Sequence, residues 1–283
     1  MNALVVTLLY APADRPDLVA KALRSSADVV VLDLEDAVAP AHKAAARDTV
    51  RELVAGSTRP VQVRVNATAT PWHDEDLTLV SSLRTDVGVR LPKVETSDDV
   101  VKVAARLPGR PLHLLIESAL GVENAFALAT AASTVASVGL GEADLLSDMR
   151  CTAEEGLAFA RSRIIVAARA AGLPSPTMSV YPHVRDRDGL RDSCLVGRRL
   201  GFCGRAAIHP GQLDVIRTAF APAPDEVAHA QRVIDSVGAA GDAGVGVVLL
   251  ADGTFLDIAM VEHARFILAL VAATADGGGG RQD

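Results

Sequence analysis

Aromatic residues and cysteines are scarce in this 283-residue sequence, at 3% aromatics and three cysteines. The cysteines are Cys151, Cys194 and Cys203, and their odd number and wide spacing exclude a disulfide framework and a zinc motif. We therefore expect reduced thiols in a cytoplasmic protein. The apolar residues are mainly Ala, Val and Leu, which suit parallel strands covered on both faces.

The sequence also lacks an excess of basic charge. Its 28 basic and 35 acidic residues give a formal charge of −7, which argues against a nucleic-acid partner. The apolar start, Leu4–Tyr10, is too short to span a bilayer and lacks the basic flank and cleavage site of a signal peptide. We expect neither a nucleic-acid nor a membrane partner.

Short runs rich in Val and Leu recur along most of the chain, separated by segments of helical period. Strands that alternate with helices form parallel βαβ units, and eight of them favour a (β/α)₈ TIM barrel over an open doubly wound sheet. The predicted strands are Leu4–Tyr10, Asp28–Leu34, Val61–Asn66, Val87–Val94, Leu112–Ser118, Val135–Leu140, Thr177–Tyr181 and Phe202–Ile208.

Polar residues cluster where six of these runs end. The clusters are Asp33–Asp36, Arg64–Asn66, Lys93–Glu95, Glu117–Ser118, Glu142–Asp144 and His209–Pro210. The carboxyl ends of barrel strands meet on one face, where catalytic groups lie, so we expect these clusters to surround one pocket.

A different composition follows residue 220. Pro222 and Pro224 mark a break, and a helical stretch, a Gly-rich turn and another helix follow. We predict a barrel over residues 1–220, a C-terminal extension or lid over 221–275 that contacts a neighbouring subunit, and a flexible Gly-rich tail over 276–283.

At the strand ends the sequence closely resembles the HpcH/HpaI aldolase and citrate lyase family, in its citrate lyase β-subunit-like, CoA-ester lyase branch. The matching stretches are Tyr10–Asp17, Val31–Val38, Val63–Asn66, Thr70–His73, Leu91–Val94, Ile116–Ser118, Gly139–Asp148, Ala207–Pro210 and Gly253–Asp257. The resemblance implies a barrel with a C-terminal extension, a homotrimer or hexamer, Mg²⁺ and an acyl-CoA substrate.

The resemblance assigns Glu117 and Asp144 to the metal. Mg²⁺ prefers oxygen ligands and keeps positions open for water and substrate, so two carboxylates from neighbouring strands fit it. The alternative is that both carboxylates pair with arginine. Arg64 is implied to bind the substrate carboxylate, for which a guanidinium fork is well suited, although it could also pair with Glu35 or Asp36.

Glu35 is implied to be catalytic, through a metal-bound water and Arg64. Because adjacent strand residues point to opposite faces, we expect Glu35 and Asp36 to have separate roles, with Asp36 structural or capping a helix. In related CoA-ester lyases an aspartate like Asp257 reaches a neighbouring subunit's active site and exchanges a proton with the thioester; an exposed turn residue is the alternative.

Further candidates carry weaker signals. Gly141 would allow close approach of a substrate oxygen. Arg15 and Lys21 frame the start of the first helix, where they could bind the anionic groups of a CoA ester. His73 and His209 are expected to be structural.

One departure from the family pattern concerns the order of residues after the sixth strand. Family members often have Gly-x-Glu-Asp there, whereas this chain has Glu142 one position earlier, which leaves the role of Glu142 open.

The resulting hypothesis is a Mg²⁺-dependent carbon–carbon lyase acting on a short 3-hydroxyacyl-CoA of the malyl-, β-methylmalyl- or citramalyl-CoA type, yielding acyl-CoA and glyoxylate or pyruvate. The alternatives are a citryl-thioester lyase subunit, a CoA-free pyruvate aldolase, an acyl-CoA thioesterase and a non-catalytic binding subunit.

Overall fold

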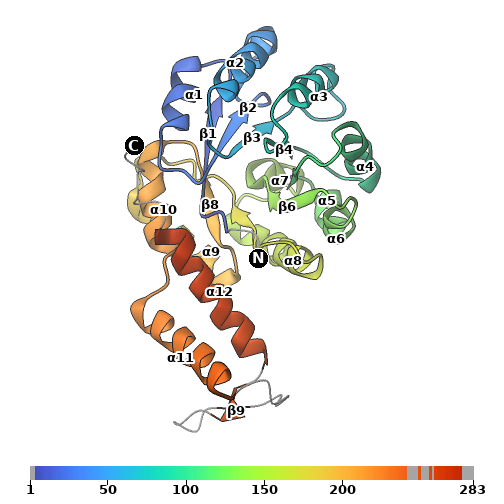
Figure 1. The fold of residues 1–283 in the computed structure, drawn as a ribbon. Coiled ribbons are helices and arrows are strands. Elements are labelled where there is room, and N and C mark those ends of the chain that lie inside the picture. The colour runs from blue at the N-terminus through green and yellow to red at the C-terminus, as the bar shows by residue number, and fades with distance from the viewer. Residues whose placement is uncertain (1–3, 241–247, 250–254, 257, 276–283) are drawn as a thin grey trace.

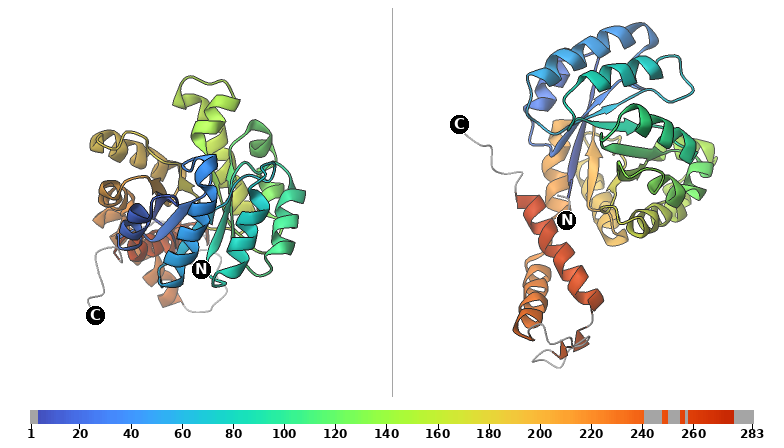
Figure 2. Two further views of the ribbon diagram at one scale, coloured as in Figure 1. Left: turned by 90° about the horizontal axis from the view of Figure 1, so that it is seen from above. Right: turned by 45° about the vertical axis from the view of Figure 1, so that its right-hand side comes forward.

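Eight parallel strands form a nearly closed (β/α)₈ barrel in the computed structural model, which describes residues 4–240, 248–249, 255–256 and 258–275. Figure 1 and Figure 2 show the helices surrounding the strands. Each strand pairs with its neighbour in the sequence and β1 pairs with β8, but among the described residues β6 and β7 share no ladder. The strands are β1 Thr7–Pro12, β2 Val29–Asp33, β3 Val61–Arg64, β4 Gly88–Leu91, β5 Leu112–Ile116, β6 Val135–Leu140, β7 Thr177–Met178 and β8 Gly204–Ala207.

The connections between the strands are helical. The α-helices of the barrel are α1 Pro16–Leu23, α2 Lys43–Ala55, α3 His73–Ser82, α4 Ser97–Arg106, α5 Ala119–Glu123, α6 Ala125–Ala129, α7 Glu142–Asp148, α8 Ala158–Ala170, α9 Arg187–Leu200 and α10 Leu213–Phe220. Short 3₁₀ turns η1 Pro40–His42, η2 Glu154–Leu157 and η3 Pro210–Gln212 precede α2, α8 and α10.

The predicted barrel is confirmed, and each of its eight strands overlaps one of the eight predicted runs. Most observed strands end earlier than predicted. After β3 and β5 the reason lies in side-chain bonds outside the ladder: Asn66 bonds to Lys43 and Asp76, and Glu117 accepts the backbone N–H of Lys93. The three cysteines are free, as expected.

Two apolar layers stabilise the barrel. The larger layer lies between the strands and the surrounding helices and includes Leu32, Val63, Leu114 and Phe220. The smaller layer fills part of the barrel interior, where Leu8, Val29, Val31 and Ala206 pack together. Strand β2 is buried along its whole length because its side chains point alternately into the outer and the inner apolar layer.

A helical hairpin follows the barrel. Helix α11, Pro224–Ala240, packs against α12, Ile258–Ala275, through their own apolar cluster, and the short strands β9 Val248–Leu249 and β10 Phe255–Leu256 pair antiparallel between them. Figure 1 and the right view of Figure 2 show that this hairpin projects away from the barrel. None of the described helices is both long and apolar enough to cross a membrane. The predicted flexible tail, 276–283, lies outside the described residues.

Candidate active site

Arg64, the last residue of β3, is held at the barrel mouth by a carboxylate that the sequence reasoning missed. Asp33, the last residue of β2, is its register partner, and the two make a bidentate pair: Nε to Oδ1 is 2.8 Å and Nη2 to Oδ2 is 2.6 Å. Asp33 also accepts the backbone N–H of Glu35, at 2.9 Å. Asp33 thus orients the guanidinium and the loop after β2 together. The sequence feature that could have identified Asp33 is its position at a strand end, two residues before the acidic pair Glu35 and Asp36.

Glu35 and Asp36 contact the same cations, so the expectation that they point to opposite faces was wrong. Arg64 Nη1 lies 3.0 Å from Glu35 Oε2 and 3.4 Å from Asp36 Oδ2. Strand alternation does not apply, because β2 ends at Asp33 and both carboxylates lie in the following turn. Asp36 does not cap a helix, since the next one, η1, has Ala39 at its N-terminal cap.

Lys93 lies among the carboxylates and was also missed as a site residue, although it follows β4 within a matching stretch. Its Nζ donates to Glu35 Oε1 at 2.6 Å and lies 4.0 Å from Glu117 Oε2 and 3.9 Å from Asp144 Oδ2. Burial opposes its charged form, but the hydrogen bond to Glu35 and the surrounding carboxylates outweigh burial and raise the pKa of Lys93. Its backbone is left-handed, with φ of 52°, which is unusual for a residue with a side chain.

Glu117, just after β5, is buried beside this cluster. Its Oε2 accepts the backbone N–H of Lys93 at 2.8 Å. Burial, and next the charge of Glu35, raise the pKa of Glu117 to about 7. The Glu117 side chain packs directly against Gly141, where an added Cβ would lie 2.7 Å from Glu117 Cδ. A side chain at position 141 would therefore displace Glu117.

The two acidic residues of α7 have different surroundings. Glu142 makes a buried bidentate pair with Arg161, with bonds of 2.7 and 2.8 Å. Asp144 is half exposed and faces Lys93. The shifted order therefore leaves Asp144 open to a ligand, whereas Glu142 is neutralised by Arg161.

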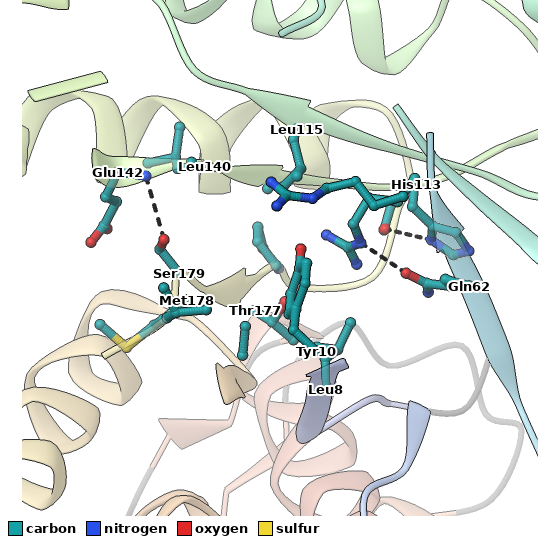
Figure 3. Close-up of a pocket in the computed structure, with 18 of the residues that line it drawn as sticks. Leu8, Tyr10, Gln62, His113, Leu115, Leu140, Glu142, Thr177, Met178 and Ser179 are labelled. Atoms are coloured by element: carbon teal, nitrogen blue, oxygen red, sulfur yellow. Dashed lines mark hydrogen bonds between the residues drawn. The ribbon is translucent and has the colours of Figure 1, made fainter. Parts of the chain in front are cut away.

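Arg64, Glu117 and Asp144 line one cavity of about 640 Å³, which runs from the mouth into the barrel interior. Sites for small ligands commonly have volumes of ~300–1,000 Å³. Figure 3 shows Tyr10, Gln62 and His113 in this cavity, with dashed lines for the hydrogen bonds of Gln62 and His113.

The charges at the mouth suit a cation. Five carboxylates, those of Asp33, Glu35, Asp36, Glu117 and Asp144, face the two cations Arg64 and Lys93. Glu35 Oε2 is buried and accepts no well-aligned hydrogen bond from the described residues, although Arg64 Nη1 lies 3.0 Å from it. In the described ranges no three or more His, Cys, Asp or Glu side chains form a group that could hold a metal ion. Two carboxylates completed by water and substrate oxygens fit Mg²⁺.

The other predicted residues lie elsewhere. Arg15 is exposed at the N-terminal cap of α1 and pairs with Asp17, whereas Lys21 lies in the last turn of α1, so the expectation that it frames the helix start was wrong. Neither of the two lines the cavity. Asp257 lies outside the described residues.

The two histidines expected to be structural make local contacts. His73 Nδ1 lies 2.8 Å from the carbonyl oxygen of Asn66. His209 caps η3, where its Nδ1 accepts the backbone N–H of Gly211.

Comparisons with known proteins find relatives that match nearly the whole chain. Citrate lyase subunit beta from Leuconostoc mesenteroides subsp. cremoris is 33% identical, over 94% of this chain and 93% of its own length. A (3S)-malyl-CoA thioesterase from Cereibacter sphaeroides is 34% identical, over 95% of each chain. The crystal structure of the protein CitE from Mycobacterium tuberculosis in complex with magnesium, acetoacetate and coenzyme A superposes with a TM-score of 0.78 and 31% identity, covering 96% of this chain and 99% of that one.

The family model of the HpcH/HpaI aldolase/citrate lyase family matches residues 6–210, a range that contains all eight strands and the carboxylates of the mouth. The chain therefore belongs to the HpcH/HpaI aldolase/citrate lyase family.

Proposed function

We propose that this protein is a Mg²⁺-dependent carbon–carbon lyase that cleaves or forms a short 3-hydroxyacyl-CoA of the malyl-, β-methylmalyl- or citramalyl-CoA type. The products of cleavage are an acyl-CoA and glyoxylate or pyruvate. The observation that carries the proposal is the shared cavity: Arg64, Glu117 and Asp144 open onto one space at the mouth of the barrel. The magnesium, coenzyme A and small carbonyl acids named with the related structures support it.

Glu117 and Asp144 would hold the Mg²⁺, which supplies polarisation of the substrate's hydroxyl or oxo oxygen. Arg64 binds the carboxylate of the oxo-acid part through its fork. Asp33 keeps that fork oriented, because its two bonds occupy one edge of the guanidinium.

The cleavage is a retro-aldol step. The substrate hydroxyl gives its proton to a basic group or water at the barrel mouth. The bond between the hydroxyl-bearing carbon and the thioester α-carbon breaks, and the electron pair of that bond forms the thioester enolate. A proton added to the α-carbon then completes the acyl-CoA. A carboxylic acid near the α-carbon can supply that proton.

Glu35 and Lys93 support the site in this scheme. Glu35 does not line the cavity, but it contacts Arg64 and Lys93, so we assign it the positioning of both cations rather than contact with the substrate. Lys93 in turn carries positive charge to within 4.0 Å of Glu117.

The C-terminal hairpin supplies the remaining group in this proposal. Helices α11 and α12 extend away from their own barrel, and α11 packs mainly on α12 (Figure 2). We propose that the hairpin reaches a neighbouring subunit of a trimer or hexamer, and that Asp257, in the segment between β10 and α12, protonates the thioester α-carbon there. Arg15 and Lys21 are proposed to meet the anionic part of CoA at the outer edge.

The decisive test compares Glu117→Gln and Asp144→Asn with Glu142→Gln. Calorimetry measures Mg²⁺ binding, and turnover of malyl-CoA and citramalyl-CoA is followed by release of glyoxylate or pyruvate. We expect the first two variants to lose Mg²⁺ binding and turnover, since each removes a ligand charge. Glu142→Gln should keep Mg²⁺ binding, because Glu142 is neutralised by Arg161. Unchanged Mg²⁺ affinity in either of the first two variants would reject the metal assignment.

Thioester hydrolysis is a second candidate, favoured by the relatives named (3S)-malyl-CoA thioesterase. The two activities differ in their products. Cleavage of malyl-CoA yields acetyl-CoA and glyoxylate without a free thiol, whereas hydrolysis yields malate and the CoA thiol. A thiol reagent in the same assay therefore separates them.

A further inference from the structure

Tyr10 carries a hydroxyl group into the cavity. It lies on β1 between Leu8 and Pro12, and all three line the cavity, because alternate residues of a strand point to the same face. Figure 3 shows the hydroxyl of Tyr10 pointing away from Leu8. Among the residues that the structure describes, no side chain or backbone group forms a hydrogen bond with this hydroxyl. Since a tyrosine hydroxyl removed from bulk water usually has a partner, that of Tyr10 is left for a ligand or for water.

The other tyrosine of the chain, Tyr181, gives a contrast. Its hydroxyl donates to Asp186 Oδ2 at 2.6 Å, and Tyr181 does not line the cavity. The free hydroxyl is therefore a property of Tyr10 and of its place in the barrel.

Tyr10 lies beside a row of polar side chains. Arg64, Arg90, His113 and Ser137 are successive register partners on β3 to β6. The row begins at the last residue of β3 but meets β5 at its second residue, so it descends from the mouth into the interior. The ring centroid of Tyr10 lies 5.4 Å from Arg64 Cζ and 6.0 Å from Arg90 Cζ. Two guanidinium groups thus lie beside its ring.

The two guanidinium groups differ in their counter-charges. Arg64 pairs with Asp33, whereas Arg90 forms no ion pair with a carboxylate in the described part of the chain. Arg90 is 6% exposed and donates its Nε to the neutral side chain of Gln62 at 2.9 Å. The charge of Arg90 therefore favours an anionic ligand in the space near Tyr10.

The hydroxyl of Tyr10 keeps its proton in these surroundings. Burial raises the pKa of Tyr10 above its ordinary value of 10.0, and the charges of Arg90 and Arg64 lower it by less. A neutral phenol can donate a hydrogen bond, and an ionised carboxylate can only accept one. A carboxylate is therefore a suitable partner for this hydroxyl.

We propose that the hydroxyl of Tyr10 donates a hydrogen bond to the carboxylate of the oxo-acid, so that Tyr10 and Arg64 hold this carboxylate together. This inference rests on the proposed function and adds to it a substrate-binding residue from β1. The carboxylate is the only ionised group of glyoxylate and of pyruvate, and Arg64, its partner in the proposed function, lies beside the ring of Tyr10.

The kinetic effect of losing this bond depends on the substrate atom that accepts it. A carboxylate keeps its charge throughout the reaction, so a bond to it stabilises the bound substrate and the transition state alike, and its loss raises KM without lowering kcat. A bond to the hydroxyl or oxo oxygen, where charge develops, would contribute to kcat instead.

The test compares the native chain with Tyr10→Phe, which keeps the ring and removes only the hydroxyl. Calorimetry measures the Kd of glyoxylate and of pyruvate for the full-length protein saturated with Mg²⁺, and condensation of each acid with acetyl-CoA gives kcat and KM. We expect Tyr10→Phe to raise the Kd and the KM of the acid roughly 10- to 100-fold, as loss of one hydrogen bond to a charged group predicts. The kcat at saturating acid should stay within roughly twofold of the native value.

Tyr181→Phe is the matched control. It also removes one tyrosine hydroxyl, but at a site outside the cavity, so it should keep the native Kd and KM. In urea unfolding, Tyr10→Phe should be as stable as the native chain, because the described residues make no hydrogen bond to the hydroxyl that it removes. A binding role therefore changes affinity without changing stability.

Three results would overturn the inference. A native Kd in Tyr10→Phe would mean that the hydroxyl meets only water. A lower kcat with an unchanged KM would place the bond on the reacting oxygen and not on the carboxylate. If the native chain binds neither acid in the presence of Mg²⁺, the proposed function fails together with the inference, whereas a loss of acid binding in Glu117→Gln but not in Tyr10→Phe overturns the inference alone.

Discussion

Replacing Arg64 with lysine tests whether the site needs the guanidinium fork or only its charge. In the native chain Arg64 makes bonds of 2.8 and 2.6 Å to the two oxygens of Asp33. A lysine ammonium keeps the charge but cannot make both bonds. One oxygen of Asp33, which is 2% exposed, then loses a charge-assisted hydrogen bond of about 1.5–3 kcal/mol. We expect the free energy of unfolding to fall by about 2 kcal/mol.

Catalysis should suffer separately from stability. If Arg64 also binds the substrate carboxylate with its fork, the transition state loses a second interaction of similar size, and kcat/KM falls roughly 100-fold for a loss of about 2.7 kcal/mol. The assay is Mg²⁺-dependent release of glyoxylate from malyl-CoA, at a temperature where circular dichroism shows both proteins folded.

Arg47→Lys is the matched control. The Arg47 side chain is 11% exposed, against 13% for Arg64, and it bonds to the fully buried Asp76 at 3.0 Å, outside the cavity. This variant should lose similar stability and keep its kcat/KM. If Arg64→Lys also kept its kcat/KM, Arg64 would be only a structural partner of Asp33, and its assignment to the substrate would be refuted.

Two further predictions follow from the site. Gly141→Ala should weaken Mg²⁺ binding at least roughly tenfold in calorimetry, because the new Cβ would displace Glu117, whereas Gly56→Ala, with open space around it, should not; equal affinities would contradict the packing argument. His113→Asn should reduce the acid sensitivity of the fold. The pKa of His113 is about 3 in the folded chain and 6.5 ordinarily, so acid protonates this histidine in the unfolded chain first. The resulting contribution to the free energy of unfolding is complete above pH 6.5 and is lost as the pH falls. Between pH 7 and 5 the native chain should lose about 1–2 kcal/mol more than the variant in urea unfolding, since part of the ring faces the cavity; parallel losses would contradict the burial of His113.

The strands and the position of the active face were predictable because their signals are local. Most strands are short runs rich in Val and Leu, and each polar cluster follows its own run directly. Glu117, Asp144 and Arg64 could therefore be assigned to the mouth without knowledge of any contact between them. The motifs at the same strand ends also led to the family, whose model matches residues 6–210.

Pairings across the barrel were not predictable in this way. Asp33 as the partner of Arg64, the position of Lys93 among the carboxylates and the neutralisation of Glu142 by Arg161 each join segments that are 19 to 58 residues apart. The left-handed backbone of Lys93 has no local signal, since its sequence carries no glycine there.

By itself, then, the sequence determined which segments become strands, which ends carry charge and which family the chain resembles, since periodicity and motifs are properties of contiguous residues. Only the tertiary structure decided which charges meet and that the row through Arg90 and His113 descends into the interior. Those features depend on the register between strands, which hydrogen bonding and the shear of the closed barrel establish between distant segments.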